Sequence, residues 1–109
     1  MLETLKGLRD QLNKKIENDE KVREVIASKD RTIVLEFTDE KTYVLEVKDG
    51  EVLEPREGTL EDPTLYVKTD IGTMNKLIEK KMNPLMAYAM RKIKVEGPID
   101  DIMVLKDLF

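Results

Sequence analysis

The sequence predicts a two-layer α+β domain, in which helices cover one face of a sheet of about five mostly antiparallel strands. Three observations lead to this fold class. Apolar residues recur at helical spacing in the N-terminal third and again after residue 70. Between these regions, and once more near residue 95, apolar and polar residues alternate with the period of two that is typical of strands. Because the strands are polar at alternate positions, one face of the sheet is expected to meet solvent and the other to lie under the helices.

The N-terminal third is predicted to be helical. Leu5, Leu8, Leu12 and Ile16 follow one another at helical spacing, which places them on one face. Asn18 is expected to cap a second helix, because acidic residues follow it and suit the first helical turn. The buried side of this second helix is expected to contain Val22, Val25 and Ile26.

Two alternating segments follow and are predicted to pair as a hairpin. Their apolar residues are Ile33, Leu35 and Phe37 in the first segment and Tyr43, Leu45 and Val47 in the second. A loop at residues 39–41 would place Phe37 opposite Tyr43, and both strands then present the same apolar face. A type I′ turn at Asp49-Gly50 is expected to lead into a short third strand around Val52 and Leu53.

The second half of the chain is predicted to contain two more strands around two helices. Alternation predicts a fourth strand at Leu65 and Val67 and a fifth at Ile93 and Val95. Asp70 or Thr69 is expected to cap the first helix, whose apolar side is Ile71, Met74, Leu77 and Ile78. Asn83-Pro84 starts the next helix, with Asn83 as the N-cap and Leu85, Met86, Ala89 and Met90 as the apolar side. An apolar terminal segment follows Gly97-Pro98.

Composition excludes several classes of function. The 109 residues contain no Cys and no His, which excludes disulfides, thiolate zinc sites, cysteine nucleophiles and Ser-His-Asp catalysis. A net charge of −4 argues against nucleic acid as a partner. The sequence has neither a signal peptide pattern nor a run of about 20 apolar residues, so we expect a cytoplasmic protein without a transmembrane segment.

Charged and aromatic residues offer only weak candidates for chemistry. The acidic pairs 39–40, 61–62 and 100–101 would suit a divalent cation or a shared proton, but they fall at turns and a helix start, where acidic residues are favoured for backbone reasons. Lys92 and Lys94 are expected on the wet face of a strand. Tyr88 is expected to pack in the core with a wet tip, the alternative being that its hydroxyl meets a polar ligand head group.

Five of the six methionines lie after residue 73, at positions 74, 82, 86, 90 and 103. One interpretation is an ordinary apolar core. The other is a deformable apolar cavity, because the methionine side chain is flexible and polarisable and adapts to variable apolar partners. The terminal segment favours the second interpretation, since it is apolar on all sides from Ile102 to Leu105.

A motif in the second half of the chain consists of Lys81-Met82-Asn83-Pro84, then Ala87-Tyr88, then Lys92-Ile93-Lys94-Val95-Glu96-Gly97. It resembles the motif of the sterol carrier protein type-2 domain, whose pattern is Lys-Leu-Asn-Pro, Ala-Phe and Lys-Leu-Lys-Ile-x-Gly at matching spacing. The resemblance covers about residues 30 to 105. This sequence departs from the pattern at Lys80 and Arg91, where family members often have Gly, and at Pro98, which replaces a small polar residue.

The resemblance implies a single lipid-binding domain over residues 1–109, with an apolar tunnel between the sheet and the helices. It implies non-enzymatic binding, with or without transfer, of a sterol-like, isoprenoid or fatty acyl lipid, without cofactor or metal. An alternative is an accessory or docking module for a lipid- or isoprenoid-metabolising enzyme, with that enzyme or a second copy as partner. A third hypothesis is that the chain is an enzyme. It is disfavoured, because the sequence offers no nucleophile with a base to activate it. The candidate ligand-binding residues are Phe37, Leu45, Met74, Leu77, Ile78, Met82, Leu85, Met86, Ala89, Met90, Met103, Leu105 and Phe109.

Overall fold

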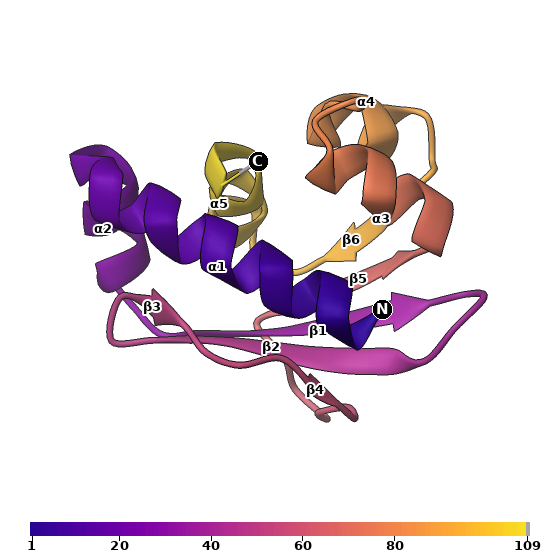
Figure 1. The fold of residues 1–109 in the computed structure, drawn as a ribbon, viewed down its shortest axis with the longest axis horizontal. Coiled ribbons are helices and arrows are strands. Elements are labelled where there is room, and N and C mark those ends of the chain that lie inside the picture. Colours follow the sequence, from indigo (N-terminus) through magenta and orange to yellow (C-terminus); the bar gives the residue numbers. More distant parts are fainter. Residues whose placement is uncertain (109) are drawn as a thin grey trace.

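Five helices lie on one face of a six-stranded sheet in the computed structural model, which describes residues 1–108 (Figure 1). The predicted two-layer α+β class is therefore confirmed. The helices are α1 (Leu2–Asn18), α2 (Glu20–Ala27), α3 (Ile71–Ile78), α4 (Pro84–Ala89) and α5 (Ile99–Leu108). The strands are β1 (Arg31–Phe37), β2 (Thr42–Lys48), β3 (Glu51–Val52), β4 (Arg56–Glu57), β5 (Leu65–Thr69) and β6 (Lys94–Glu96).

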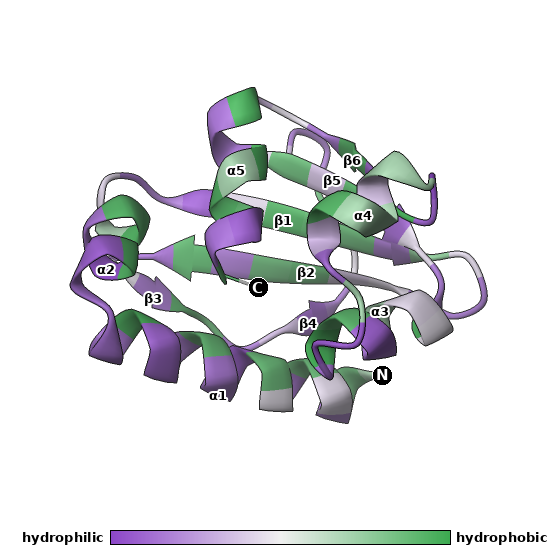
Figure 2. Ribbon diagram, turned by 90° about the horizontal axis from the view of Figure 1, so that it is seen from above, coloured by the Kyte–Doolittle hydropathy of each residue, from purple (hydrophilic) through white to green (hydrophobic). Residues whose placement is uncertain are grey.

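The sheet is mixed, with one parallel pair at its centre. Its strand order is β3-β2-β1-β5-β6, and β4 pairs with β2 beside this path. β1 and β5 run parallel, whereas every other pair among the described strands is antiparallel. α3 and α4 connect β5 to β6. Seen from above, α4 and α5 lie over the half of the sheet that contains β5 and β6, whereas α1 lies along the other half with α3 near its N-terminal end (Figure 2).

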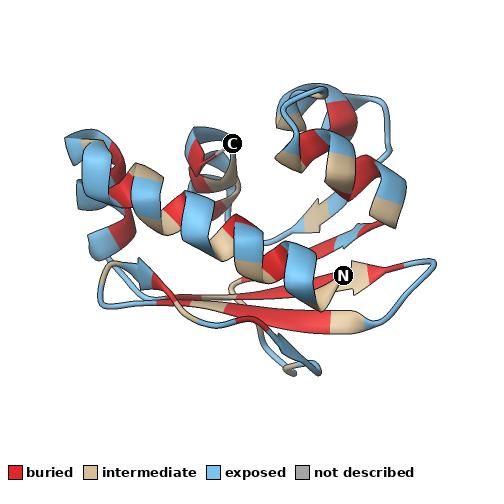
Figure 3. Cartoon of the chain, in the orientation of Figure 1, coloured by how far each residue is buried: buried red, intermediate tan, exposed pale blue. Residues whose placement is uncertain are grey.

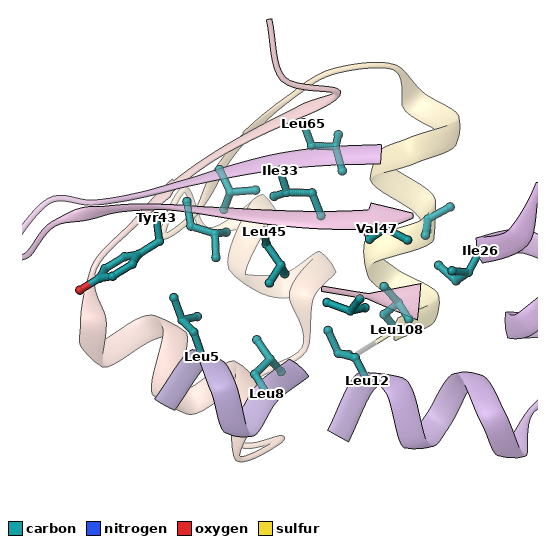
Figure 4. Packing of buried hydrophobic residues seen from close by; sticks show 14 of the residues in the cluster. Leu5, Leu8, Leu12, Ile26, Ile33, Tyr43, Leu45, Val47, Leu65 and Leu108 are labelled. Atoms are coloured by element: carbon teal, nitrogen blue, oxygen red, sulfur yellow. The ribbon is translucent and has the colours of Figure 1, made fainter. Parts of the chain in front are cut away.

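The apolar stripe of α1 forms one layer of the core. Leu5, Leu8, Leu12 and Ile16 are all buried, as their spacing predicts. Figure 4 shows Leu5, Leu8 and Leu12 pointing from α1 toward the strands. The start of α2 differs from the prediction by one residue, because Asp19 rather than Asn18 accepts the N–H groups of residues 21 and 22. α2 also buries only Val22 and Ile26, whereas Val25 is exposed because it lies off the face that meets the core.

The β1–β2 hairpin has the predicted faces but a different register. Leu35 pairs with Tyr43 and Ile33 with Leu45, so the predicted register, with Phe37 opposite Tyr43, is wrong by two residues. A shift of two residues leaves every side chain on the same face, so alternation cannot distinguish the two registers. The loop is closed tightly, with the Phe37 N–H donating to the Lys41 carbonyl at 3.4 Å and the Glu40 N–H donating to the Phe37 carbonyl at 3.3 Å.

The outer face of the sheet is not wet throughout. Val34 and Val44 pair across the hairpin and are only 2% and 1% exposed, although they alternate with the residues that face the helices. The chain between β4 and β5 runs beneath the sheet at this point (Figure 1), and Thr64 in it exchanges hydrogen bonds with Thr32 at 3.0 Å in both directions. A connection without apolar periodicity therefore covers part of a face that was predicted to meet solvent.

A side chain of α1 closes one edge of the sheet. The Asn13 amide donates to the Val52 carbonyl at 2.9 Å, and its oxygen accepts the Val52 N–H at 2.7 Å. These are the two backbone groups that a further strand beside β3 would use, because alternate residues of an edge strand point their N–H and C=O outward. Asn13 thus takes the place of a neighbouring strand.

Several turns require a left-handed backbone. Asp49 and Gly50 both have positive φ, at 54° and 78°, as the predicted type I′ turn requires. Lys80 and Arg91, which stand where the resembling family often has Gly, have φ of 61° and 59° and end α3 and α4. At Gly97, where φ is 150°, a Cβ atom would lie 2.5 Å from the Thr64 carbonyl oxygen. Only glycine fits this position without displacing the neighbouring strand.

A buried ion cluster holds α5 against the start of β1. The Asp101 side chain is 0% exposed and accepts hydrogen bonds from Arg31 Nε and Lys29 Nζ, each at 2.8 Å. Burial raises the pKa of this carboxyl, but the hydrogen bonds and charges of Lys29 and Arg31 outweigh burial and hold the pKa below its usual value. Asp101 is therefore charged at neutral pH. It joins α5 to Arg31 and Lys29, which precede it by 70 and 72 positions in the sequence.

An apolar cavity between the sheet and the helices

The helices do not fill the space above the sheet, and an apolar cavity of about 320 Å³ remains there. Its floor is the apolar face of the strands, with Ile33, Leu35, Leu45, Val47, Val52, Val67 and Val95, together with Ile93 just before β6. Its walls come from four helices, with Leu8 and Leu12 of α1, Met74 and Leu77 of α3, Pro84, Leu85 and Tyr88 of α4, and Ile99, Ile102, Met103, Leu105, Lys106 and Leu108 of α5. In the view from above, the strands beneath this space are coloured largely as hydrophobic (Figure 2).

The cavity opens between α4 and α5. Leu85, Tyr88, Ile99 and Met103 line it and are also exposed to solvent, Ile99 to 76%. The polar side-chain groups of the lining are the Tyr88 hydroxyl and the Lys106 ammonium, and both belong to exposed residues. The floor, formed by the strands, is entirely apolar. The site can therefore desolvate hydrocarbon in its interior and offer a cation and a hydroxyl near its mouth.

The structure brings together six of the candidate ligand-binding residues. Leu45, Met74, Leu77, Leu85, Met103 and Leu105 line the cavity. Six others lie outside the lining: Phe37, Ile78, Met82, Met86, Ala89 and Met90. Phe37 is buried and packs edge-on against Tyr43, with ring centroids 6.0 Å apart. Phe109 lies outside the described residues.

The expected apolar side of α4 is the main difference from the prediction. Ala87 faces the core and is 0% exposed, whereas Leu85, Met86, Ala89 and Met90 are exposed. Asn83 caps this helix, as predicted, by accepting the Leu85 N–H at 2.8 Å. Every residue from Leu85 to Met90 is apolar or aromatic, so hydrophobic periodicity cannot select the buried face of this helix. Met86 and Met90, at 56% exposure each, belong neither to the core nor to the cavity lining.

The sequence pattern predicts that much of the lining belongs to the core. It identifies the strand residues of the floor as apolar and inward-facing, but it does not show that a cavity separates them from the helices. Lys106 is not among the predicted site residues. Its signal is its position three residues after Met103 and four after Ile102, which places it on the same helical face.

Three of the six residues in the acidic pairs, Asp39, Glu40 and Asp101, have structural partners. Asp39 accepts the Ile71 N–H at 3.1 Å and so ties the hairpin loop to α3. Glu40 accepts a hydrogen bond from the Tyr43 hydroxyl at 2.8 Å. The burial of Tyr43, together with this bond, raises the pKa of Tyr43 to about 12. Asp101 is held by Arg31 and Lys29. Among residues 1–108, no three acidic side chains come together as metal ligands would.

A family model described as the SCP-2 sterol transfer family matches residues 8–109. The chain belongs to this family. Family membership implies lipid binding or transfer, and domains of this kind are lipid-binding carriers that generally lack enzymatic activity. No curated protein sequence matches the chain. In the part of the chain that the structure describes, no helix is both long and apolar enough to cross a membrane.

Solved structures with the SCP-2 fold resemble the chain over most of its length. The sterol carrier protein domain 2 of Helicoverpa armigera is 25% identical, with a TM-score of 0.69 over 89% of this chain and 78% of that one. A UbiJ-SCP2 ubiquinone synthesis protein shares the fold at 14% identity, with a TM-score of 0.65 over 94% of this chain and 84% of that one. The sec-alkylsulfatase Pisa1 from Pseudomonas sp. shares it at 19% identity and a TM-score of 0.67 over 80% of this chain. The match to this chain spans only 14% of the sulfatase.

Proposed function

We propose that this chain binds one long apolar lipid in the cavity between its sheet and its helices and carries it without catalysis. The observation that carries the proposal is the cavity itself, whose volume of about 320 Å³ lies within the range of small-molecule sites. Its apolar floor suits a sterol-like, isoprenoid or fatty acyl chain without selecting among them. A continuous tunnel and ligand contacts from Phe37, Ile78, Met82, Ala89 and Phe109 remain predictions that a lipid complex would test. Met86 and Met90 are not part of the proposed site, because both are exposed and lie outside the cavity lining.

Desolvation is the proposed source of affinity. Burying about 300 Å² of hydrocarbon at about 25 cal/mol/Å² stabilises the complex by about 7 kcal/mol before the costs of association are subtracted. Taken alone, this gain corresponds to a dissociation constant of about 7 μM, and the costs of association weaken it further. Because area burial does not distinguish one hydrocarbon from another, loose chemical selectivity is expected. Neither Tyr88 nor Lys106 is buried, so polar contacts would orient the ligand more than they hold it.

A matched pair of methionine variants tests the site. Met103 lines the cavity and is 42% exposed, whereas Met90 is similarly exposed but lies outside the lining. Met103→Trp is expected to occupy the mouth and weaken binding of a monomeric fluorescent fatty acid by tenfold or more. Met90→Trp is expected to leave affinity within about twofold. Each variant adds the only indole to a chain without Trp, so its emission reports directly on its surroundings.

Native mass spectrometry of freshly purified protein is the complementary measurement. A lipid retained by the wild type and absent from Met103→Trp would identify the ligand. Equal loss of fatty acid binding in both variants, with unchanged folding, would contradict the placement of the site in the cavity.

A role as an accessory module is a second proposal. The same fold covers only a small part of the alkylsulfatase and nearly all of the ubiquinone synthesis protein, so it exists both within larger enzymes and as most of a chain. In this role the chain would dock on a lipid- or isoprenoid-metabolising enzyme. The test is the activity of such an enzyme with the wild-type chain and with Met103→Trp added. Equal stimulation by both proteins would favour docking over lipid carriage.

The organisation and location of the protein are also proposals. We propose that residues 1–109 act as a single lipid-binding domain in the cytoplasm. The one sheet with a common helical layer supports the first part, and a sequence without cysteine is compatible with the second. Limited proteolysis and localisation of a tagged chain would test them.

A further inference from the structure

Exposed apolar side chains are concentrated at one place on the molecule. Of the seven large hydrophobic residues exposed within residues 1–108, only Val25 lies elsewhere. The other six form what we name the α4–α5 rim: Leu85, Met86, Tyr88, Met90, Ile99 and Met103. Figure 3 shows α4 drawn largely as exposed. A gathered apolar surface of this kind marks an interaction site more often than scattered exposed residues do.

Basic side chains bracket the rim. Residues 80–92 contain four basic and no acidic side chains, with Lys80 and Lys81 before α4 and Arg91 and Lys92 after it. The rest of the chain has 15 basic and 23 acidic residues, so this segment opposes the overall charge of −4. α4 has six residues and is about 9 Å long, so all four cations lie close to the apolar side chains.

Only one of these four cations has an ion-pair partner among the described residues. Glu79 pairs with Lys81 at 2.9 Å, but no described carboxylate lies within ion-pair distance of Lys80, Arg91 or Lys92. α5 contributes the exposed acids Asp100 and Asp107 and, at the cavity mouth, Lys106. Cations still outnumber acids around the rim.

We infer that the α4–α5 rim docks on an anionic lipid bilayer. Apolar side chains flanked by cations have the two features of an interfacial anchor, since the apolar groups enter the boundary region while the cations meet lipid phosphates. Four rim residues, Leu85, Tyr88, Ile99 and Met103, also line the cavity, so a lipid would pass from the bilayer to the cavity along apolar surface. α1 cannot take this role while folded, because its apolar stripe is buried.

A second copy of the chain is a poorer fit to the same surface. A symmetric contact through the rim would bring four cations of each copy together, and like charges at an interface disfavour association. An anionic bilayer instead complements the cations and accepts the apolar side chains.

Flotation with vesicles tests the inference. Wild-type protein is expected to bind vesicles of phosphatidylcholine with phosphatidylglycerol, to bind pure phosphatidylcholine weakly, and to be released as salt rises. Arg91→Gln with Lys92→Gln is expected to weaken binding by roughly fivefold per cation removed, about 25-fold in total. The control is Lys14→Gln with Lys21→Gln, two exposed lysines without a described ion pair on α1 and α2, which should change binding by less than twofold.

The apolar part of the rim needs its own variant. Met86→Ser with Met90→Ser is expected to reduce vesicle binding by tenfold or more, while Val25→Ser, on the exposed side of α2, has no effect. None of these residues lines the cavity, so every variant should bind monomeric fluorescent fatty acid as the wild type does.

These measurements separate the docking inference from the proposed function. Fatty acid binding without vesicle binding would overturn docking and leave the carrier role standing, whereas the reverse would overturn the carrier role alone. Equal binding to neutral and anionic vesicles would overturn the assigned partner. Docking would also be overturned by a dimer that Met86→Ser dissociates, or by a partner protein that binds the rim when vesicles do not.

Discussion

The Asp101 cluster makes a strong prediction about stability. Asp101→Ala would leave the Arg31 guanidinium, only 5% exposed, without its carboxylate, and the remaining bonds from that side chain reach backbone carbonyls at 3.2 to 3.5 Å. Breaking a buried ion pair from one side costs about 3–5 kcal/mol. Domains of this size have total stabilities of about 5–15 kcal/mol, so the melting temperature should fall by more than about 10 °C.

Two further variants give the measurement its controls. Lys29 is 49% exposed and donates to the other oxygen of the same carboxylate, so Lys29→Ala should cost only about 0–1 kcal/mol. Arg31→Met in the Asp101→Ala background removes the unpaired buried charge, and part of the lost stability should return. Urea unfolding compares all four proteins. A cost below about 1 kcal/mol for Asp101→Ala, or a further loss on adding Arg31→Met, would refute this account of the cluster.

The pKa of Asp101 adds a dependence on pH. Because the folded-state pKa lies below that of the unfolded chain, the carboxylate stabilises the fold above about pH 4 and this contribution is lost as pH falls through the folded pKa. The difference in stability between wild type and Asp101→Ala should be constant from about pH 7 to 5 and should shrink below about pH 4. A difference that grows on acidification would mean that the carboxyl is destabilised by burial.

Three other predictions follow from backbone geometry and from the cavity. Lys80→Gly and Arg91→Gly should each raise stability in urea by about 0.5–1 kcal/mol by relieving a positive φ, whereas Lys76→Gly inside α3 should lower it by about 1 kcal/mol. Gly97→Ala should lower stability by about 1–3 kcal/mol, because its Cβ would meet the Thr64 carbonyl and Leu65; an unchanged melting temperature would contradict that close approach. A fatty acid at about 100 times its dissociation constant should add about 2.7 kcal/mol and slow amide exchange in α5, which lines the cavity, more than in α2, which does not. No change in exchange in either helix would argue against occupancy of the cavity.

Local patterns predicted much of the fold because they depend on near neighbours in sequence. The spacing of Leu5, Leu8 and Leu12 was enough to identify the buried face of α1, since any helix with that stripe must cover it. The Asn83 cap and the Asp49-Gly50 turn were recognisable for the same reason, because each is determined by the backbone of two to four residues.

Features that depend on distant contacts or on degenerate patterns escaped prediction. The hairpin register moved by two residues without changing any face, and α4 had no polar residue to identify its outer side. Asp101 looked like an ordinary helix-start acid, because its partners Arg31 and Lys29 are 70 and 72 residues away. The cavity could not be predicted for a similar reason. An apolar sheet face has the same sequence pattern whether the helices contact it directly or leave a space above it.

The bond between Asn13 and Val52 gives α1 a protective role. If α1 lifted from the sheet, its apolar stripe and both outward backbone groups of Val52 would become accessible in a single event. An uncovered edge strand beside released hydrophobic side chains is a template for intermolecular strand addition. α1 therefore both packs the core and protects the β3 edge from aggregation. Selection for solubility would act on Asn13 as well as on Leu5, Leu8 and Leu12.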